Sequence, residues 1–210
     1  EAARAYREKL AEAAAETDDD LHAKYLEEGS IGEAEMLEAL RRAITSGDVV
    51  PVLCASATRG IGIAPLLDLI AKELPSPVEQ GAVEGTDPRT KATVQRAPDP
   101  KAPLSVLVFK TISDPHVGKL SVFRVYSGTL RADSQIYNAT RESRERIGHL
   151  GWLSGKTQKP VEALGPGEIG VVAKLKDTLT GDTLCEEGHP EGLPGIVFPE
   201  PAISFPDQPK

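Results

Sequence analysis

Five segments between residues 104 and 175 are rich in β-branched and aromatic residues, and turn-forming sequences separate each from the next. No helical periodicity interrupts this part of the chain. Several short strands with a turn between each pair are typical of closed all-β barrels and sandwiches. The predicted strands are 104–112, 120–126, 135–139, 144–153 and 168–175.

Helical patterns precede this β-rich part. In residues 1–45, apolar side chains recur at three- and four-residue steps, which predicts helices. Residues 17–20 offer hydrogen-bond acceptors and negative charge where a second helix would begin. Ser30 and Glu33 have the spacing of a capping box before a third helix.

An α/β pattern follows these helices. The apolar run at 49–54 predicts a strand, and the small residues at 55–62 predict a turn after it. A helix with Pro65 in its first turn is predicted to run to Leu74. Strand, glycine-containing loop and helix together are typical of the last β–α unit of an open α/β sheet. Residues 1–74 are therefore predicted to be an α/β remnant.

Prolines and glycines interrupt every pattern in residues 75–103, so this stretch is predicted to be a linker over the surface. The proline-rich tail at 193–210 is predicted to be extended and to belong to whatever follows. The chain starts at Glu1 inside a helical pattern, which we interpret as a piece of a longer protein.

Charge is distributed unevenly along the 210 residues. The net charge is −8, yet residues 104–160 carry 9 basic and 4 acidic side chains. A cationic segment in an acidic protein favours a local face for a polyanion, although chance clustering on a solvated surface gives the same count. No apolar run is long enough for a membrane span, so we expect a cytosolic protein that does not contact membranes.

Few residues have the type and spacing of a catalytic, metal-binding or phosphate-binding site. Cys54 and Cys185 each lie in an apolar run, as buried structural cysteines do, and the four histidines show no ligand spacing, so no metal site is predicted. The sequence GWLSGKT at 151–157 superficially matches a phosphate-binding loop. Only three residues separate its glycines, and Pro160 prevents a following helix, so we interpret it as a basic β-turn.

Three longer strings carry a family resemblance. They are DPHVGKL at 114–120, FRVYSGTL at 123–130 and KDTLTGDTL at 176–184. With the Ser-Ala turn after the predicted strand, YLE at 25–27 and FPEP at 198–201, they make the chain similar to elongation factor G over nearly all of its length. Residues 154–158 replace a segment that contains Met-His in elongation factor G proper. This difference favours the paralogous, elongation-factor-G-like branch.

The resemblance implies a division of the chain. Residues 1–74 would complete a GTP-binding domain, 75–103 would be a linker, 104–190 would form a β-barrel of the translation-factor domain II type, and 191–210 would open domain III. In the family, the Ser-Ala loop contacts guanine, which corresponds to Ser56 and Ala57. Thr58 and Arg59 stand where the family has other residues, so this contact is expected to be incomplete.

The sequence contains no phosphate loop, no switch motif and no base-reading motif. We therefore expect no enzymatic activity and no cofactor in this piece, while GTP and Mg²⁺ would bind the parent protein.

In the family this barrel docks on RNA of the small ribosomal subunit. Arg144 and Arg146, two residues apart on a strand, share one face. The full basic group is Lys110, Lys119, Arg124, Arg131, Arg141, Arg144, Arg146, Lys156 and Lys159. All but Lys110 and Arg131 are predicted RNA-binding residues.

Three functions remain open at this point. The first is ribosome docking. The second is a structural relay, in which the barrel contacts the switch regions of the parent's GTPase core and does not bind RNA directly. Glu142 and Glu145 would then neutralise their basic neighbours on an ordinary surface. The GTPase core and domain III of the parent chain would be intramolecular partners. The third, an independent enzyme on a β-barrel, has no supporting residues.

Overall fold

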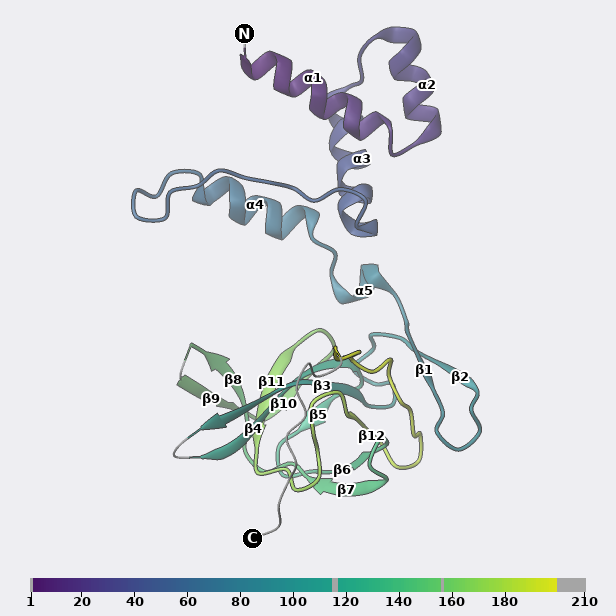
Figure 1. Cartoon of the computed structure of the whole chain (residues 1–210), viewed down its shortest axis with the longest axis vertical. Coiled ribbons are helices and arrows are strands. Elements are labelled where there is room, and N and C mark those ends of the chain that lie inside the picture. The colour runs from purple at the N-terminus through teal and green to yellow at the C-terminus, as the bar shows by residue number, and fades with distance from the viewer. Residues whose placement is uncertain (1, 115–116, 156, 200–210) are drawn as a thin grey trace. The chain divides into compact units, whose positions relative to one another are not determined.

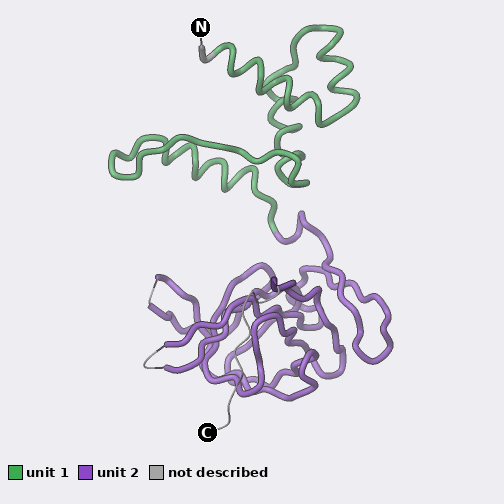
Figure 2. Tube along the Cα trace, in the orientation of Figure 1, with its two compact units in different colours: residues 1–76 green, residues 77–210 purple. Residues whose placement is uncertain are grey.

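A computed structural model describes residues 2–114, 117–155 and 157–199. The chain divides into two compact units, residues 1–76 and 77–210 (Figure 2). Among the described residues, no helix is long and apolar enough to cross a membrane.

Unit 1 is helical, as predicted for residues 1–45. Buried Ala14, Met36 and Ala39 form a small core, which Leu21 and Leu40 flank. Because most of these core residues are small, the helices approach closely but bury little apolar area. The helices are α1 (Ala2–Ala15), α2 (Asp19–Glu28), α3 (Glu33–Ser46) and α4 (Ile63–Glu73) (Figure 1).

The observed helix caps agree only in part with those predicted from the sequence. The Asp18 side chain accepts the N–H of Leu21 at 3.1 Å and caps α2, within the predicted 17–20 segment. The cap before α3 lies two residues later than expected. There Glu35, rather than Glu33, accepts a main-chain N–H, that of Gly32, at 3.0 Å.

The predicted strand at 49–54 does not form. Val50 is 79% exposed and Val52 is 90% exposed, so the run is apolar but uncovered. A strand needs a neighbour to pair its main-chain groups, and no such neighbour is present among the described residues of unit 1. The following loop and α4 form as predicted, and Leu67 and Ile70 of α4 are also exposed.

Unit 2 is built on one eight-stranded antiparallel sheet, in the order β7-β6-β12-β3-β4-β11-β8-β9. Few helices followed by a large antiparallel sheet confirm the coarse fold prediction. Two short pairs, β1-β2 and β5-β10, stand beside the main sheet. The elements are α5 (Pro77–Gln80), β1 (Val83–Thr86), β2 (Thr93–Arg96), β3 (Ser105–Asp114), β4 (Gly118–Ser127), β5 (Leu130–Arg131), β6 (Gln135–Asn138), β7 (Ser143–Arg146), β8 (Leu150–Ser154), β9 (Thr157–Val161), β10 (Ala163–Leu164), β11 (Ile169–Ala173) and β12 (Thr183–Cys185).

The inner face of the sheet holds the main core. Val106, Phe123, Leu150 and Val172 belong to it, from strands far apart in sequence. Strands alternate their side chains between faces, so the neighbours of these residues point outward. On the outer face, Leu120, Val122 and Val171 form a second cluster with Phe109, Ile112 and Ala173.

Several elements differ from the sequence prediction. The predicted strand 144–153 is two strands, because residues 147–149 leave the ladder between β7 and β8. Residues 75–103 are not a plain linker, since α5 and the β1-β2 hairpin lie there. Gly192 pairs with Thr86, and Glu191 is fully buried, so 191–193 pack within unit 2. Residues 200–210 of the predicted domain III segment lie outside the described part.

The two cysteines have different environments. Cys185, in β12, is fully buried, and burial raises the pKa of its thiol. Cys54 is exposed, contrary to the expectation of a buried residue, because it belongs to the uncovered run at 49–54.

Candidate nucleic-acid interface

The candidate site begins at β7, where successive side chains alternate between exposed and buried. Arg144 and Arg146 are exposed, and Glu145 between them is buried, so the two arginines share the outward face.

Buried Glu145 anchors the segment after β11. The N–H groups of Lys176, Asp177 and Thr178 donate to its carboxylate at 3.1, 2.8 and 3.0 Å, and the Thr178 hydroxyl donates at 2.9 Å. Burial raises the pKa of Glu145, but these hydrogen bonds outweigh it, so the pKa lies below its ordinary value. A carboxylate on one strand thereby fixes the position of lysines on another segment.

This anchoring gathers basic side chains around a cavity of about 260 Å³, which we call the cationic cavity. Arg146, Lys174 and Lys176 form no ion pair with any residue that the structure describes. The charge of these three side chains is therefore available to an external anion. The lining residues are Gln135, Arg144, Glu145, Arg146, Lys174 and Lys176.

Arg144 differs from its neighbours in this cavity because Glu187 binds it through two hydrogen bonds of 2.9 and 2.7 Å. Hydrogen bonding to the guanidinium lowers the pKa of Glu187 below its ordinary value. Both side chains are more than half exposed, so a competing phosphate can reach the guanidinium.

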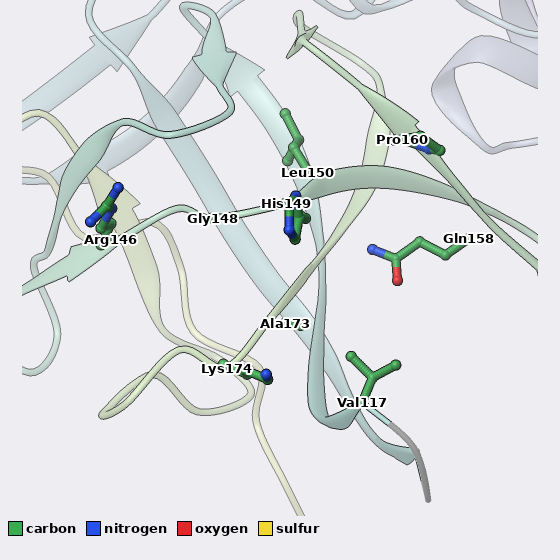
Figure 3. A pocket seen from close by; sticks show the side chains of 9 residues that line it. All are labelled: Val117, Arg146, Gly148, His149, Leu150, Gln158, Pro160, Ala173 and Lys174. Carbon is green, nitrogen blue, oxygen red and sulfur yellow. The ribbon is translucent and has the colours of Figure 1, made fainter.

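A second cavity, of about 550 Å³, adjoins the first, because Arg146 and Lys174 line both. We call it the apolar cavity. Its residues come from the end of β7 and the segment after it, from β8 and β9, from the end of β11 and the residue after it, and from the residue before β4 (Figure 3). They are Val117, Arg146, Gly148, His149, Leu150, Gln158, Pro160, Ala173 and Lys174.

Three predicted RNA-binding residues hold other parts of the sheet together. Lys119 donates its Nζ hydrogen bond to the carbonyl of Thr178. The Arg124 guanidinium lies 5.5 Å from the centre of the Tyr126 ring. Arg141 Nε lies 3.2 Å from a carboxylate oxygen of buried Asp182. None of these three side chains lines either cavity.

The β8–β9 hairpin carries the remaining predicted residues. Lys159 is exposed and pairs across the hairpin with Trp152, which is 45% exposed. Lys156 lies outside the described residues. Gly151 belongs to β8, and β9 begins at Thr157, so the glycine-rich string is part of a hairpin with no helix after it.

The Ser-Ala loop of unit 1 is a tight turn. The Ser56 N–H donates to the Ile61 carbonyl at 2.9 Å, and the Ile61 N–H donates back at 3.2 Å. Both main-chain groups of Ser56 are thus engaged within the loop, whereas Ala57 is exposed. Within the described part of the chain, no three His, Cys, Asp or Glu side chains gather in a way that could hold a metal ion.

Sequence reasoning missed Lys174, Lys176, His149 and Gln158. Lys174 and Lys176 are two residues apart, the same spacing as Arg144 and Arg146, but residues 161–210 have 3 basic and 9 acidic side chains. The segment count therefore concealed them.

The chain is similar to a protein family and to solved structures. Residues 103–187 match the family model "Elongation factor G domain 2". The chain also matches the crystal structure of ttk003000868 from Thermus thermophilus, with 30% sequence identity and a TM-score of 0.67. That match covers 94% of this chain and 27% of the Thermus protein, so the chain spans about a quarter of its relative's length.

Proposed function

Because this chain belongs to the elongation factor G family, we propose that its sheet domain docks a translation factor on RNA of the small ribosomal subunit. The docking surface is the cationic cavity and its rim. RNA phosphates are the ligands, and the contacts are read by shape rather than by base sequence.

One observation carries this proposal. Arg146 of β7 and Lys174 and Lys176 after β11 line one cavity with no ion pair among the described residues, in a chain of net charge −8. Like charges repel, so an unpaired cluster is costly unless an anion neutralises it. An arginine fork with flexible lysines matches phosphate oxygens on adjacent nucleotides.

We also propose that the sheet closes into a barrel. β5 precedes β6 and pairs with β10, which follows edge strand β9. The N–H of Ala132 donates to the Glu162 carbonyl at 2.9 Å and extends this pairing. Closure would hold β7 and β8 rigidly, and a rigid scaffold fixes the spacing of the phosphate-binding side chains.

The parent protein would supply the remaining functions. We propose that it binds GTP and Mg²⁺ through parts that precede this chain, and that the present piece has no enzymatic activity of its own. Its GTPase core and domain III would be the intramolecular partners, and the ribosome the intermolecular partner in the cytoplasm. Assignment to the elongation-factor-G-like branch remains a prediction.

The experiment is a titration of the 210-residue chain against isolated small ribosomal subunits at 0.1 and 0.3 M salt. Neutralising two or three phosphates of a duplex gives a log–log salt slope of about 2–3, hence about a tenfold loss of affinity over this range. Absence of binding at low salt would reject docking and favour the structural relay.

A further inference from the structure

The apolar cavity has a composition that phosphate binding does not explain. Val117, Gly148, Leu150, Pro160 and Ala173 supply an apolar lining of a cavity of about 550 Å³. That volume is within the range of sites that take small molecules. The lining has few polar groups. Gln158 and His149 lie among the apolar residues, and Arg146 and Lys174 lie on the side shared with the cationic cavity.

The apolar cavity has one wall on the β8–β9 hairpin. Gly151 and Pro160 are cross-strand partners, and so are Leu153 and Gln158, so all four share one face of the hairpin. A Cβ on Gly151 would lie only 2.9 Å from Cγ of Gln158, so glycine lets that side chain lie against the strand. Gly148 also lines the cavity, and a Cβ there would meet no atom within 4 Å.

The cations lie on one side only. Arg146 and Lys174 line the apolar cavity and also the cationic cavity, so a ligand in the former has an anion site beside it. A ligand complementary to both has an uncharged, largely apolar body joined to a phosphate. An apolar protein side chain would fill the hollow but would leave the adjacent cations without a partner.

We propose that the apolar cavity holds one unstacked RNA base whose phosphate binds Arg146 and Lys174. The inference rests on the proposed RNA docking and adds a base subsite to it. Single-stranded loops and bulges present such bases, and proteins read them through their edges. The Gln158 amide can donate and accept on the base edge, and the His149 ring is a further hydrogen-bonding group in the lining (Figure 3).

The test uses three dye-labelled RNA hairpins, measured by fluorescence anisotropy with the unmodified chain. One hairpin carries a single bulged adenosine, the second an abasic residue at that position, and the third is fully paired. Burying a base contributes at least about fivefold in affinity, so the first hairpin should bind at least that much more tightly than the other two.

Gly148→Leu fills the cavity wall and should abolish the preference for the bulged base. Gly195→Leu is the matched control, because a Cβ there also meets no atom within 4 Å and the residue is away from both cavities. It should keep the full preference. A preference that survives in Gly148→Leu would overturn the assignment to this cavity.

A measurement on the unmodified chain removes any dependence on variant folding. Methyl NMR signals of Ala173 and Val117 should shift with adenosine monophosphate and not with ribose 5-phosphate. Absence of a shift with adenosine monophosphate would overturn the base subsite. Salt-sensitive binding of all three hairpins with equal affinity would also overturn it, yet leave phosphate docking intact. Failure to bind any hairpin would contradict both proposals.

Discussion

Replacing Glu145 with glutamine should destabilise unit 2 and displace the lysines of the cationic cavity. Glu145 is 4% exposed, and its carboxylate accepts hydrogen bonds from three main-chain N–H groups and one hydroxyl. If the glutamine carbonyl replaces Oε1, it keeps the bonds from Asp177 and Thr178. Its NH₂ group then faces the N–H of Lys176, and two donors cannot bond.

The cost follows from these contacts. One buried donor without a partner costs about 1–3 kcal/mol, and weakening the other bonds by removing the charge adds about 1 kcal/mol. Glu145→Gln should therefore reduce the free energy of unfolding by about 2–4 kcal/mol and lower the Tm by about 5–15 °C.

Urea unfolding followed by circular dichroism at pH 7 measures this change. Hydrogen exchange of the 176–178 amides should accelerate in parallel. Glu142→Gln, a change at an exposed position just before β7, is the control and should stay within about 0.5 kcal/mol. If Glu145→Gln also stays within that limit, the anchoring role is refuted.

The same variant has a defined pH dependence. The folded-state pKa of Glu145 lies below its ordinary value of 4.5, so ionised Glu145 stabilises the fold above that pH. Its contribution is lost as the pH falls through the folded pKa. The difference between the original chain and Glu145→Gln should shrink over that acidic range. A difference that stays constant from pH 7 to pH 3 would contradict the assignment of the carboxylate as the stabilising form.

Three further predictions concern the rest of the chain. Calorimetry should detect no GTP binding, because the sequence has no phosphate loop to complement Ser56 and Ala57; micromolar affinity would contradict this. Hydrogen exchange should be faster in unit 1 than in unit 2, since apolar residues such as Val52 are uncovered; equal protection would argue otherwise. Glu187→Gln frees Arg144 and should raise affinity for small subunits by about two- to fivefold, with unchanged affinity as the opposing result.

The sequence predicted those elements whose signals are local. The helices, the long β3-β4 hairpin and the shared face of Arg144 and Arg146 follow from periodicity alone. The strand predicted at 49–54 shows the limit of this reasoning. Its apolar residues are typical of a buried strand, but a strand forms only where a neighbouring strand pairs with its main chain. Periodicity does not reveal whether such a neighbour is present.

The site was predictable only in part, because its cations come from segments of opposite net charge. Lys174 and Lys176 reach the cavity because buried Glu145 binds the main chain at 176–178. Nothing local marks that glutamate as buried, and sequence reasoning treated it as a surface neutraliser of its neighbours. The partner of Arg141 was also hidden from the sequence, since Asp182 lies 41 residues away and is buried.

Charge reversal at the cationic cavity tests whether this cavity docks on the small ribosomal subunit. The variant is Arg146→Glu with Lys174→Glu, and the control is Arg4→Glu with Arg7→Glu on exposed positions of α1. Each chain is titrated against isolated small ribosomal subunits over a range of salt concentrations.

If RNA phosphates bind in this cavity, the cavity variant should lose at least about tenfold in affinity at moderate salt. Its log–log salt slope should fall by about 1.8, since each lost duplex phosphate contact removes about 0.9. The α1 variant should bind like the original chain. Equal affinities and equal slopes for the two variants would contradict docking through this cavity, and the structural relay would then be the better account of the sheet domain.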